Sequence, residues 1–269
     1  DRNRTSPFAF TGNKFEIRAV GSSQNCAGPM AAMNAMMGLQ LVEFKTEVDK
    51  LIAKGVKQDE SILTVLKSLI RKSKPICFEG NNYSDEWKAE AAKRGLNNFA
   101  TTPEALDVLA TKQGLELYGK SGVMSKVELD AYHNVQLHSY CTKLSIEAKA
   151  LEEIVNSMVL PAAIKHQTAL ATNIAAMRAI DMDDSIGYQK DALKRVVRNI
   201  SEIKEGLEKL HKALEKTHGA DSIREEAEIL CHKARPQMDK IREAVDDLET
   251  LVDDQYWPLV KYHELLFVR

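Results

Sequence analysis

Polar and apolar residues alternate with a period of two near the start of the chain. Residues 14–19 run through Lys14, Phe15, Glu16, Ile17, Arg18 and Ala19. Such a period is typical of a β-strand with one apolar and one charged face. A short apolar segment, 7–10, comes before it, and residues 11–13 (Thr-Gly-Asn) have the composition of a turn. We therefore predict a β-hairpin with three charged side chains on one face of its second strand.

Beyond this hairpin, apolar positions follow the helical period. The predicted helices cover residues 29–53, 61–72, 84–93, 102–112, 125–140 and 145–180, with a brief strand-like run at 76–78. Ser84 has the character of an N-cap and Gly95 that of a C-cap, while Ser125 and Glu128 have the spacing of a capping box. Pro161 removes one backbone hydrogen bond, so we expect it to kink the helix over 145–180.

Two apolar seams follow in the last third of the chain. The first alternates steps of three and four residues: Leu193, Val196, Ile200, Ile203, Leu207, Leu210 and Leu214. The second returns through Ile223, Ala227, Leu230, Ala234, Met238, Ile241, Val245, Leu248 and Val252. Residues 217–221 break the pattern, and Ser222 with Glu225 restarts it as another capping box. We predict a long antiparallel helical hairpin, which either packs on the kinked helix before it or forms an oligomerisation arm, because a heptad seam does not identify its partner.

Composition narrows the class of protein. The 269 residues carry a net charge of −2, which gives no reason to expect nucleic acid or an anionic membrane as a partner. No apolar run is long enough to cross a bilayer and no signal peptide is recognisable. The four cysteines are scattered without a C-x-x-C motif, so we expect reduced thiols and a cytoplasmic protein. Neither a P-loop nor a Gly-x-Ser-x-Gly motif occurs.

The charged face of the predicted hairpin has two interpretations. It is either the solvated face of an antiparallel sheet, or the wall of a polar cavity in which a carboxylate binds a cation and arginines bind phosphate or carboxylate. Arg2 and Arg4, close by in sequence, favour the second interpretation.

Residues 3–18, NRTSPFAFTGNKFEIR, resemble the late catalytic segment of glutamine synthetases, and in particular of the type III branch, whose subunits are long. Further segments are similar to that branch in the same order: residues 21–29, 81–95, 160–163 and 257–267. The resemblance thus extends over nearly the whole chain.

The resemblance implies roles for three residues. Arg4 matches the arginine that contacts nucleotide phosphate and glutamate, Glu16 matches a ligand of an active-site Mg²⁺ or Mn²⁺, and Arg18 matches the arginine that binds the substrate glutamate. Type I members have a longer insert with a further arginine, whereas residues 7–13 here contain none. No residue is therefore assigned to that role.

The implied function is ATP-dependent synthesis of glutamine from glutamate and ammonia through a γ-glutamyl phosphate. We expect a mainly α chain, in which a hairpin remnant of the catalytic α+β domain is followed by a helical extension. The expected parts are the end of the catalytic domain (1–53), a mostly helical connection (54–120) and a long-helix domain (121–269). Since Glu16 is one carboxylate only, we expect the C-terminal part of a larger, homo-oligomeric subunit, inactive by itself. The alternative is a stand-alone helical interaction module.

Overall fold

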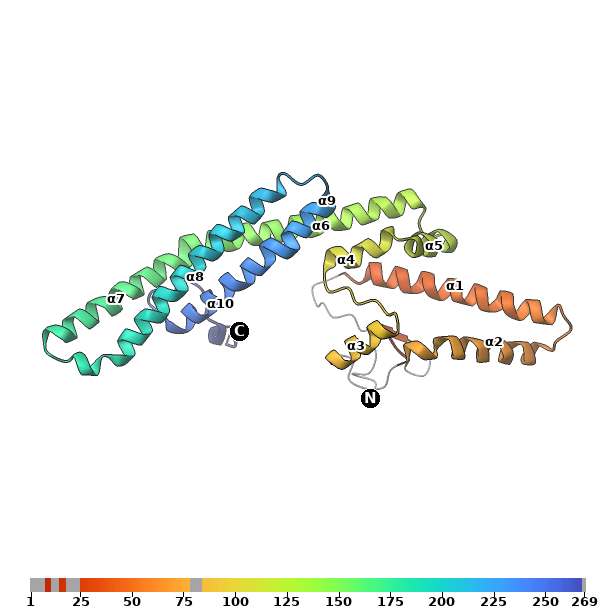
Figure 1. The fold of residues 1–269 in the computed structure, drawn as a ribbon, viewed down its shortest axis with the longest axis horizontal. Helices are drawn as coiled ribbons and strands as arrows, with labels where there is room; N and C mark the ends of the chain where they lie inside the picture. Colours follow the sequence, from red (N-terminus) through yellow and green to blue (C-terminus); the bar gives the residue numbers. More distant parts are fainter. Residues whose placement is uncertain (1–7, 11–14, 18–24, 78–83, 268–269) are drawn as a thin grey trace. The chain divides into compact units, whose positions relative to one another are not determined.

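The computed structural model describes residues 8–10, 15–17, 25–77 and 84–267, and these are mostly helical (Figure 1). The prediction of a mainly α chain is confirmed. Two compact units, residues 1–133 and 134–269, are distinguished by their internal contacts, and each is described by itself. The three-part domain division expected from the sequence stays a prediction. Within the described residues no helix is long and apolar enough to cross a membrane.

The first unit begins with two short strands, β1 (Phe8–Phe10) and β2 (Phe15–Ile17). They pair antiparallel, with Phe8 opposite Ile17 and Ala9 opposite Glu16. Both strands occupy the positions where the alternating pattern predicts them. Their assignment to a larger catalytic domain stays a prediction.

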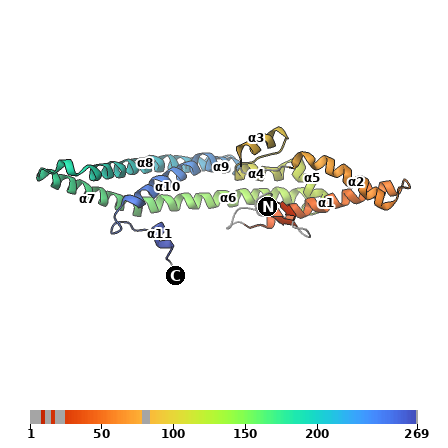
Figure 2. The same ribbon diagram turned by 90° about the horizontal axis from the view of Figure 1, so that it is seen from below.

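Helices α1 (Ala27–Ile52) and α2 (Gln58–Ser73) form an antiparallel pair that agrees with the predicted helices over 29–53 and 61–72. Figures 1 and 2 show them side by side, joined by a short turn in which Gly55 adopts a positive φ. Val48 of α1 and Val65 of α2 are buried. A further helix, α5 (Lys112–Ser121), packs against α1 and buries Tyr118.

Helix α3 (Asp85–Lys93) is fixed at both ends as predicted. The Ser84 Oγ accepts a hydrogen bond from the Trp87 backbone N–H at 3.2 Å, and Gly95 takes a positive φ of 74° just after the C-cap. Arg94 lies with its guanidinium 5.5 Å from the centre of the Trp87 ring and donates to the carbonyl oxygens of Pro75 and Cys77. One side chain thus ties this helix to the segment before it.

Two local predictions in this unit are wrong. Ile76 belongs to a 3₁₀ turn, η1 (Lys74–Ile76), and not to a strand-like run. The helix predicted over 102–112 ends early as α4 (Thr102–Asp107), followed by a 3₁₀ turn, η2 (Val108–Ala110), and α5 begins where it was expected to end. The Thr111 Oγ1, which accepts from the Gly114 backbone N–H, starts α5 anew.

Residues 126–179 are helical throughout and include the boundary between the two units in the sequence. Helix α6 (Lys126–Ile154) starts at the predicted capping box, in which the Ser125 N–H donates to Glu128 and the Glu128 N–H donates to Ser125. It runs without the break predicted after residue 140. It continues through a π-helical turn, η3 (Val155–Val159), into α7 (Leu160–Ala179).

Proline explains the π-helical turns. In an α-helix the proline ring clashes with the carbonyl four residues earlier. For Pro161 that residue is Ser157, inside η3, and for Pro236 it is His232, inside the second π-helical turn, η5 (Leu230–Ala234). A wider turn moves the carbonyl aside. At Pro161 the hydrogen bonding therefore changes from α-helical to π-helical, while the chain continues as a helix.

The second unit is built around α8 (Gly187–Thr217), which follows a 3₁₀ turn, η4 (Asp183–Ser185). The chain then reverses and returns through α9 (Ile223–Ile229), η5 and α10 (Arg235–Leu251), and a short helix, α11 (Tyr262–Leu265), lies near its end. Figure 2 shows α8 beside α7 and α10. The predicted antiparallel helical hairpin is confirmed. Ser222 caps α9 by accepting a hydrogen bond from the Glu225 backbone N–H, but the Glu225 carboxylate accepts from the Asp221 N–H instead of the Ser222 N–H, so only half of the predicted capping box is present.

The core of α8 differs from the predicted seam at three of its seven positions. Val196, Ile203, Leu207 and Leu210 are buried, as predicted. Four further buried positions are small or polar and seven residues apart: Ala192, Asn199, Gly206 and Ala213. The larger residues predicted there, Leu193, Ile200 and Leu214, are only partly buried. Small residues let two helices approach closely, and a Cβ on Gly206 would lie 2.7 Å from Ile241 Cγ1 of α10.

Candidate functional site

The structure gives the position of one of the three predicted site residues. Glu16 lies at the centre of β2, paired opposite Ala9 of β1. Arg4 and Arg18 lie outside the described residues. The grouping of these three residues into one site therefore stays a prediction.

Of the predicted site residues, Glu16 is the one with the chemistry of a metal ligand. A carboxylate such as that of Glu16 is a hard oxygen ligand, suited to Mg²⁺ or Mn²⁺. Among the described residues no group of three or more His, Cys, Asp or Glu side chains lies close enough to hold a metal. Glu16 thus fits one ligand position of a metal site, and the other ligands would have to come from elsewhere.

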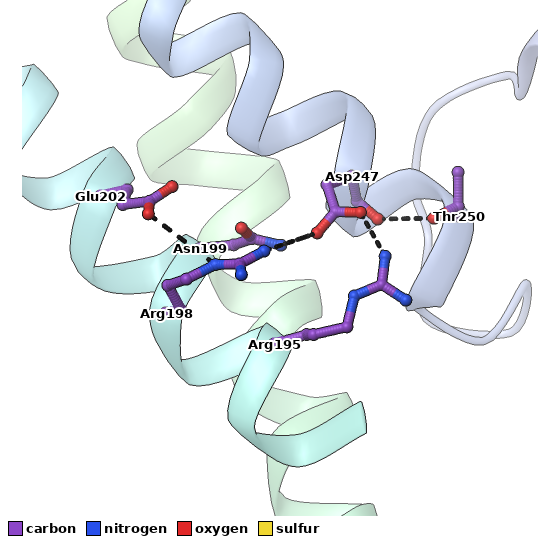
Figure 3. A network of polar contacts seen from close by, with 6 residues as sticks. All are labelled: Arg195, Arg198, Asn199, Glu202, Asp247 and Thr250. Atoms are coloured by element: carbon purple, nitrogen blue, oxygen red, sulfur yellow. Dashed lines mark hydrogen bonds and ion pairs between the residues drawn. The ribbon is translucent and has the colours of Figure 1, made fainter. Parts of the chain in front are cut away.

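A well-formed polar cluster among the described residues joins α8 to α10 (Figure 3). The Asn199 Nδ2 donates to the Asp247 Oδ2 at 2.6 Å, and Arg195 forms an ion pair with the other carboxylate oxygen. Arg198 reaches the same carboxylate at 3.5 Å, and the Thr250 Oγ1 donates to the Asp247 backbone carbonyl. Sequence reasoning missed this cluster, although one signal was available: a polar residue, Asn199, between the apolar seam positions 196 and 203.

The electrostatics of this cluster indicate a structural role. The hydrogen bond from Asn199, followed by the contacts with Arg195, holds the pKa of Asp247 below its ordinary value of 3.8. Asp247 is therefore an ionised carboxylate at neutral pH, already bound to an amide and two guanidinium groups. A base or nucleophile needs a pKa close to the working pH and an available lone pair. The cluster instead fixes the register of α8 against α10.

The thiols and histidines offer little further chemistry. Burial raises the pKa of the Cys141 thiol to about 11, so the group stays protonated, and its Sγ lies 3.8 Å from the Ile223 carbonyl oxygen. All four cysteines are free, as expected. His166 is partly buried, with its ring centre 6.5 Å from that of Tyr256, and burial lowers its pKa. It packs between α7 and the C-terminal segment.

Comparison with known proteins gives the same family across the chain. Residues 61–178 match the model of the glutamine synthetase C-terminal domain. A glutamine synthetase of Bacteroides fragilis is 40% identical over all of this chain, and the type-3 glutamine synthetase of Dictyostelium discoideum is 35% identical over all of it. A glutamine synthetase of Butyrivibrio fibrisolvens is 30% identical over 78% of the chain. The chain spans 37% of the length of the first two relatives and 29% of the third.

The matched domain begins after the hairpin and ends at α7, so it covers the helical part that carries none of the predicted site residues. The longer matches include the hairpin and the last helices. Together they show that the chain belongs to the glutamine synthetase family and corresponds to the C-terminal part of its longer members.

Proposed function

We propose that this chain is part of a glutamate–ammonia ligase that forms glutamine from glutamate, ammonia and ATP through a γ-glutamyl phosphate. The observation that carries the proposal is the similarity over all 269 residues to two proteins named glutamine synthetase. The match includes the segment with Arg4, Glu16 and Arg18, which resembles the late catalytic segment of the family.

The side chain of each of these three residues suits its proposed role in binding metal, glutamate or nucleotide phosphate. Glu16 binds a divalent cation through its carboxylate oxygens. Arg18 holds the carboxylate of glutamate, and Arg4 holds glutamate and nucleotide phosphate, because a guanidinium group forms two parallel hydrogen bonds to such groups. A bound Mg²⁺ or Mn²⁺ would neutralise the charge that develops on the transferred phosphoryl group.

Neighbouring strand residues support a shared site. On a β-strand, residues two apart point to the same face, so Glu16 and Arg18 would lie about 7 Å apart along one face if β2 continued to residue 18. That spacing suits a carboxylate on a metal beside an arginine on the substrate. Since Glu16 is a single carboxylate, the proposed catalysis depends on further ligands from the full-length protein. We expect the 269 residues alone to be inactive. The homo-oligomer and the cytoplasmic location also remain predictions.

The alternative function, a stand-alone helical interaction module, would require an open seam on α8. Val196, Ile203 and Leu210 are fully buried, and Asn199 and Gly206 contact α10 of the same chain. These contacts of α8 lie within the chain, which supports intramolecular packing of the predicted helical hairpin and leaves no open seam for the stand-alone module.

The ligase proposal is tested with Glu16→Gln in the full-length protein, measuring glutamine formed from glutamate, ammonia and ATP as Mg²⁺ or Mn²⁺ is varied. Loss of a charged metal ligand should lower turnover roughly a hundredfold or more and raise the metal concentration required. The matched control is Glu43→Gln on the exposed surface of α1. Normal turnover and normal metal dependence of Glu16→Gln would show that Glu16 is not a metal ligand.

A further inference from the structure

The chain that follows α10 folds back on itself as a compact loop. We call residues 252–261 the return loop. The Trp257 backbone N–H donates to the Asp253 carbonyl oxygen at 3.1 Å, which closes a turn near its start. The Lys261 Nζ donates to the Val252 carbonyl oxygen at 3.1 Å, so the two ends of the loop are tied to each other. These bonds give the loop a defined shape beside the end of α10.

The return loop is held on the second unit by few buried side chains. Val252 and Trp257 are 2% and 7% exposed, whereas Val260 is 61% exposed. A cleft of about 230 Å³ lies beside Trp257 and is lined also by Leu259 and Glu264. A segment with few buried apolar contacts opens locally at a lower free energy than the core. We therefore expect the return loop to open more readily than α8 and α10.

His166 of α7 contacts the return loop. Its ring centre lies 6.5 Å from that of Tyr256, and the two ring planes are inclined by 58°. Figure 2 shows the chain leaving the end of α10 beside α7. The His166 Nδ1 and the Trp257 Nε1 are both buried, and neither has a hydrogen-bond partner among the described residues. The ring of His166 is thus partly enclosed while one of its nitrogens has no partner.

Protonation changes what the buried Nδ1 of His166 requires. In neutral imidazole one ring nitrogen is a bare acceptor, whereas in the charged ring both nitrogens carry an N–H donor. A buried donor without an acceptor destabilises a fold, and a charged donor does so more strongly. The charged ring is therefore better accommodated when the return loop moves away and water reaches Nδ1.

The charged groups around His166 do not offset this effect. Burial is the largest influence on the ring and disfavours its charged form, so the pKa of His166 lies below its ordinary value of 6.5. Asp253 favours the charged ring and Lys261 disfavours it, and both belong to the return loop, as does Tyr256. When the loop opens, water replaces these surroundings and the ring binds a proton more readily. A proton that binds the open form preferentially shifts the equilibrium towards that form.

We propose that His166 is an acid-sensitive switch for the return loop: protonation of its ring releases the loop from α7, while α8 and α10 stay folded. The proposal does not depend on the proposed function, since it concerns residues outside the predicted metal and substrate contacts. Histidine is the side chain whose charge changes closest to neutral pH, so modest acidification reaches its range. Below the ordinary histidine pKa the open form binds more protons than the docked form, so the loop should open progressively as the pH falls.

The test measures the accessibility of the Trp257 side chain in the full-length protein. Hydroxyl-radical footprinting with peptide mass spectrometry gives its rate of oxidation at pH 7 and at about pH 5.5. Trp87 of α3, which has the same chemistry and lies in the other unit, is the internal control. We expect the ratio of the Trp257 rate to the Trp87 rate to rise roughly threefold or more at the lower pH, because a 7% exposed indole reacts mainly when its loop opens.

Two variants at position 166 test whether this histidine is the trigger. His166→Leu and His166→Gln cannot take up a proton, so in both of them the oxidation ratio should be the same at the two pH values. Two side chains of different polarity keep the test decisive if one of them fails to hold the loop at pH 7. His218→Leu, at an exposed position just after α8, is the matched control and should open in acid as the original protein does.

Three results would overturn the proposal. An oxidation ratio that does not change with pH in the original protein would mean that protonation of His166 does not release the loop. A change with pH that persists in both variants would place the trigger in another group. Amide hydrogen exchange that rises in α8 and α10 together with Trp257 oxidation would mean that acid unfolds the whole unit instead of releasing the loop.

Discussion

Substituting Asp247 by alanine should separate the α8–α10 polar cluster from ordinary surface charge. Asn199 is 1% exposed, and its Nδ2 donates to the Asp247 Oδ2 at 2.6 Å. Removing the acceptor leaves a buried amide without a partner, which costs about 1–3 kcal/mol. Arg195 and Arg198 are about half exposed, so each of their contacts with Asp247 adds at most about 1 kcal/mol. We expect Asp247→Ala to lower the free energy of unfolding by about 2–3 kcal/mol.

Two further variants separate the contribution of the Asn199 hydrogen bond from that of the ion pairs. Asp247→Asn keeps an oxygen that can accept from Asn199 but removes the charge, so it should cost about 1 kcal/mol. The matched control is Asp246→Ala, one residue away, which removes an exposed ion pair with Arg242 and should cost below about 0.5 kcal/mol.

The assay is urea unfolding of the second unit. Trp257 is buried in that unit, and Trp87→Phe removes the only other tryptophan, so the remaining fluorescence follows unfolding of the second unit. At pH 7 Asp247→Ala should shift the midpoint much further than Asp246→Ala. Equal shifts would refute the reasoning, because the buried amide of Asn199 would then not depend on Asp247.

The stabilisation by Asp247 should also depend on pH in a definite direction. The pKa of Asp247 is lowered in the folded protein, first by the hydrogen bond from Asn199. Its contribution to stability is therefore present above the ordinary carboxyl pKa of 3.8 and is lost as the pH falls through the lowered value. The difference between the original protein and Asp247→Ala should shrink in that acidic range, and a difference that stayed constant would contradict it.

Three other predictions concern packing and local contacts. Gly206→Ala should lower the free energy of unfolding by about 1–3 kcal/mol, because its Cβ would meet Ile241 Cγ1 at 2.7 Å; unchanged urea unfolding would contradict this close approach. Burial lowers the pKa of His166, so stability should fall as the pH drops below 6.5 towards the lowered pKa, and His166→Leu should flatten that part of a Tm-against-pH curve. Arg94→Lys should speed amide exchange in α3, because lysine cannot both stack on Trp87 and bind two carbonyl groups; unaltered exchange would mean that the arginine is dispensable.

Local signals in the sequence determined most of the helical architecture. Capping residues act within one turn, so Ser84, Ser125 and Ser222 marked helix starts correctly. The ring of Pro161 acts on the carbonyl four residues earlier, which also makes its effect readable from sequence, although the sequence did not show that a π-helical turn would absorb it. The helix predicted over 102–112 was wrong because helical period alone did not reveal that Thr111 starts a new helix.

The tertiary structure decided which faces of these helices meet. The apolar period identifies a stripe but not its partner, so only the fold showed that the small positions of α8 contact α10 and that Asn199 finds Asp247, 48 residues away. The sequence also identified Glu16, Arg4 and Arg18 through family resemblance, because those residue types suit metal and phosphate chemistry. That they meet in one site stays a prediction and would depend on neighbouring strands, since a strand fixes the side of a residue but not what lies opposite it.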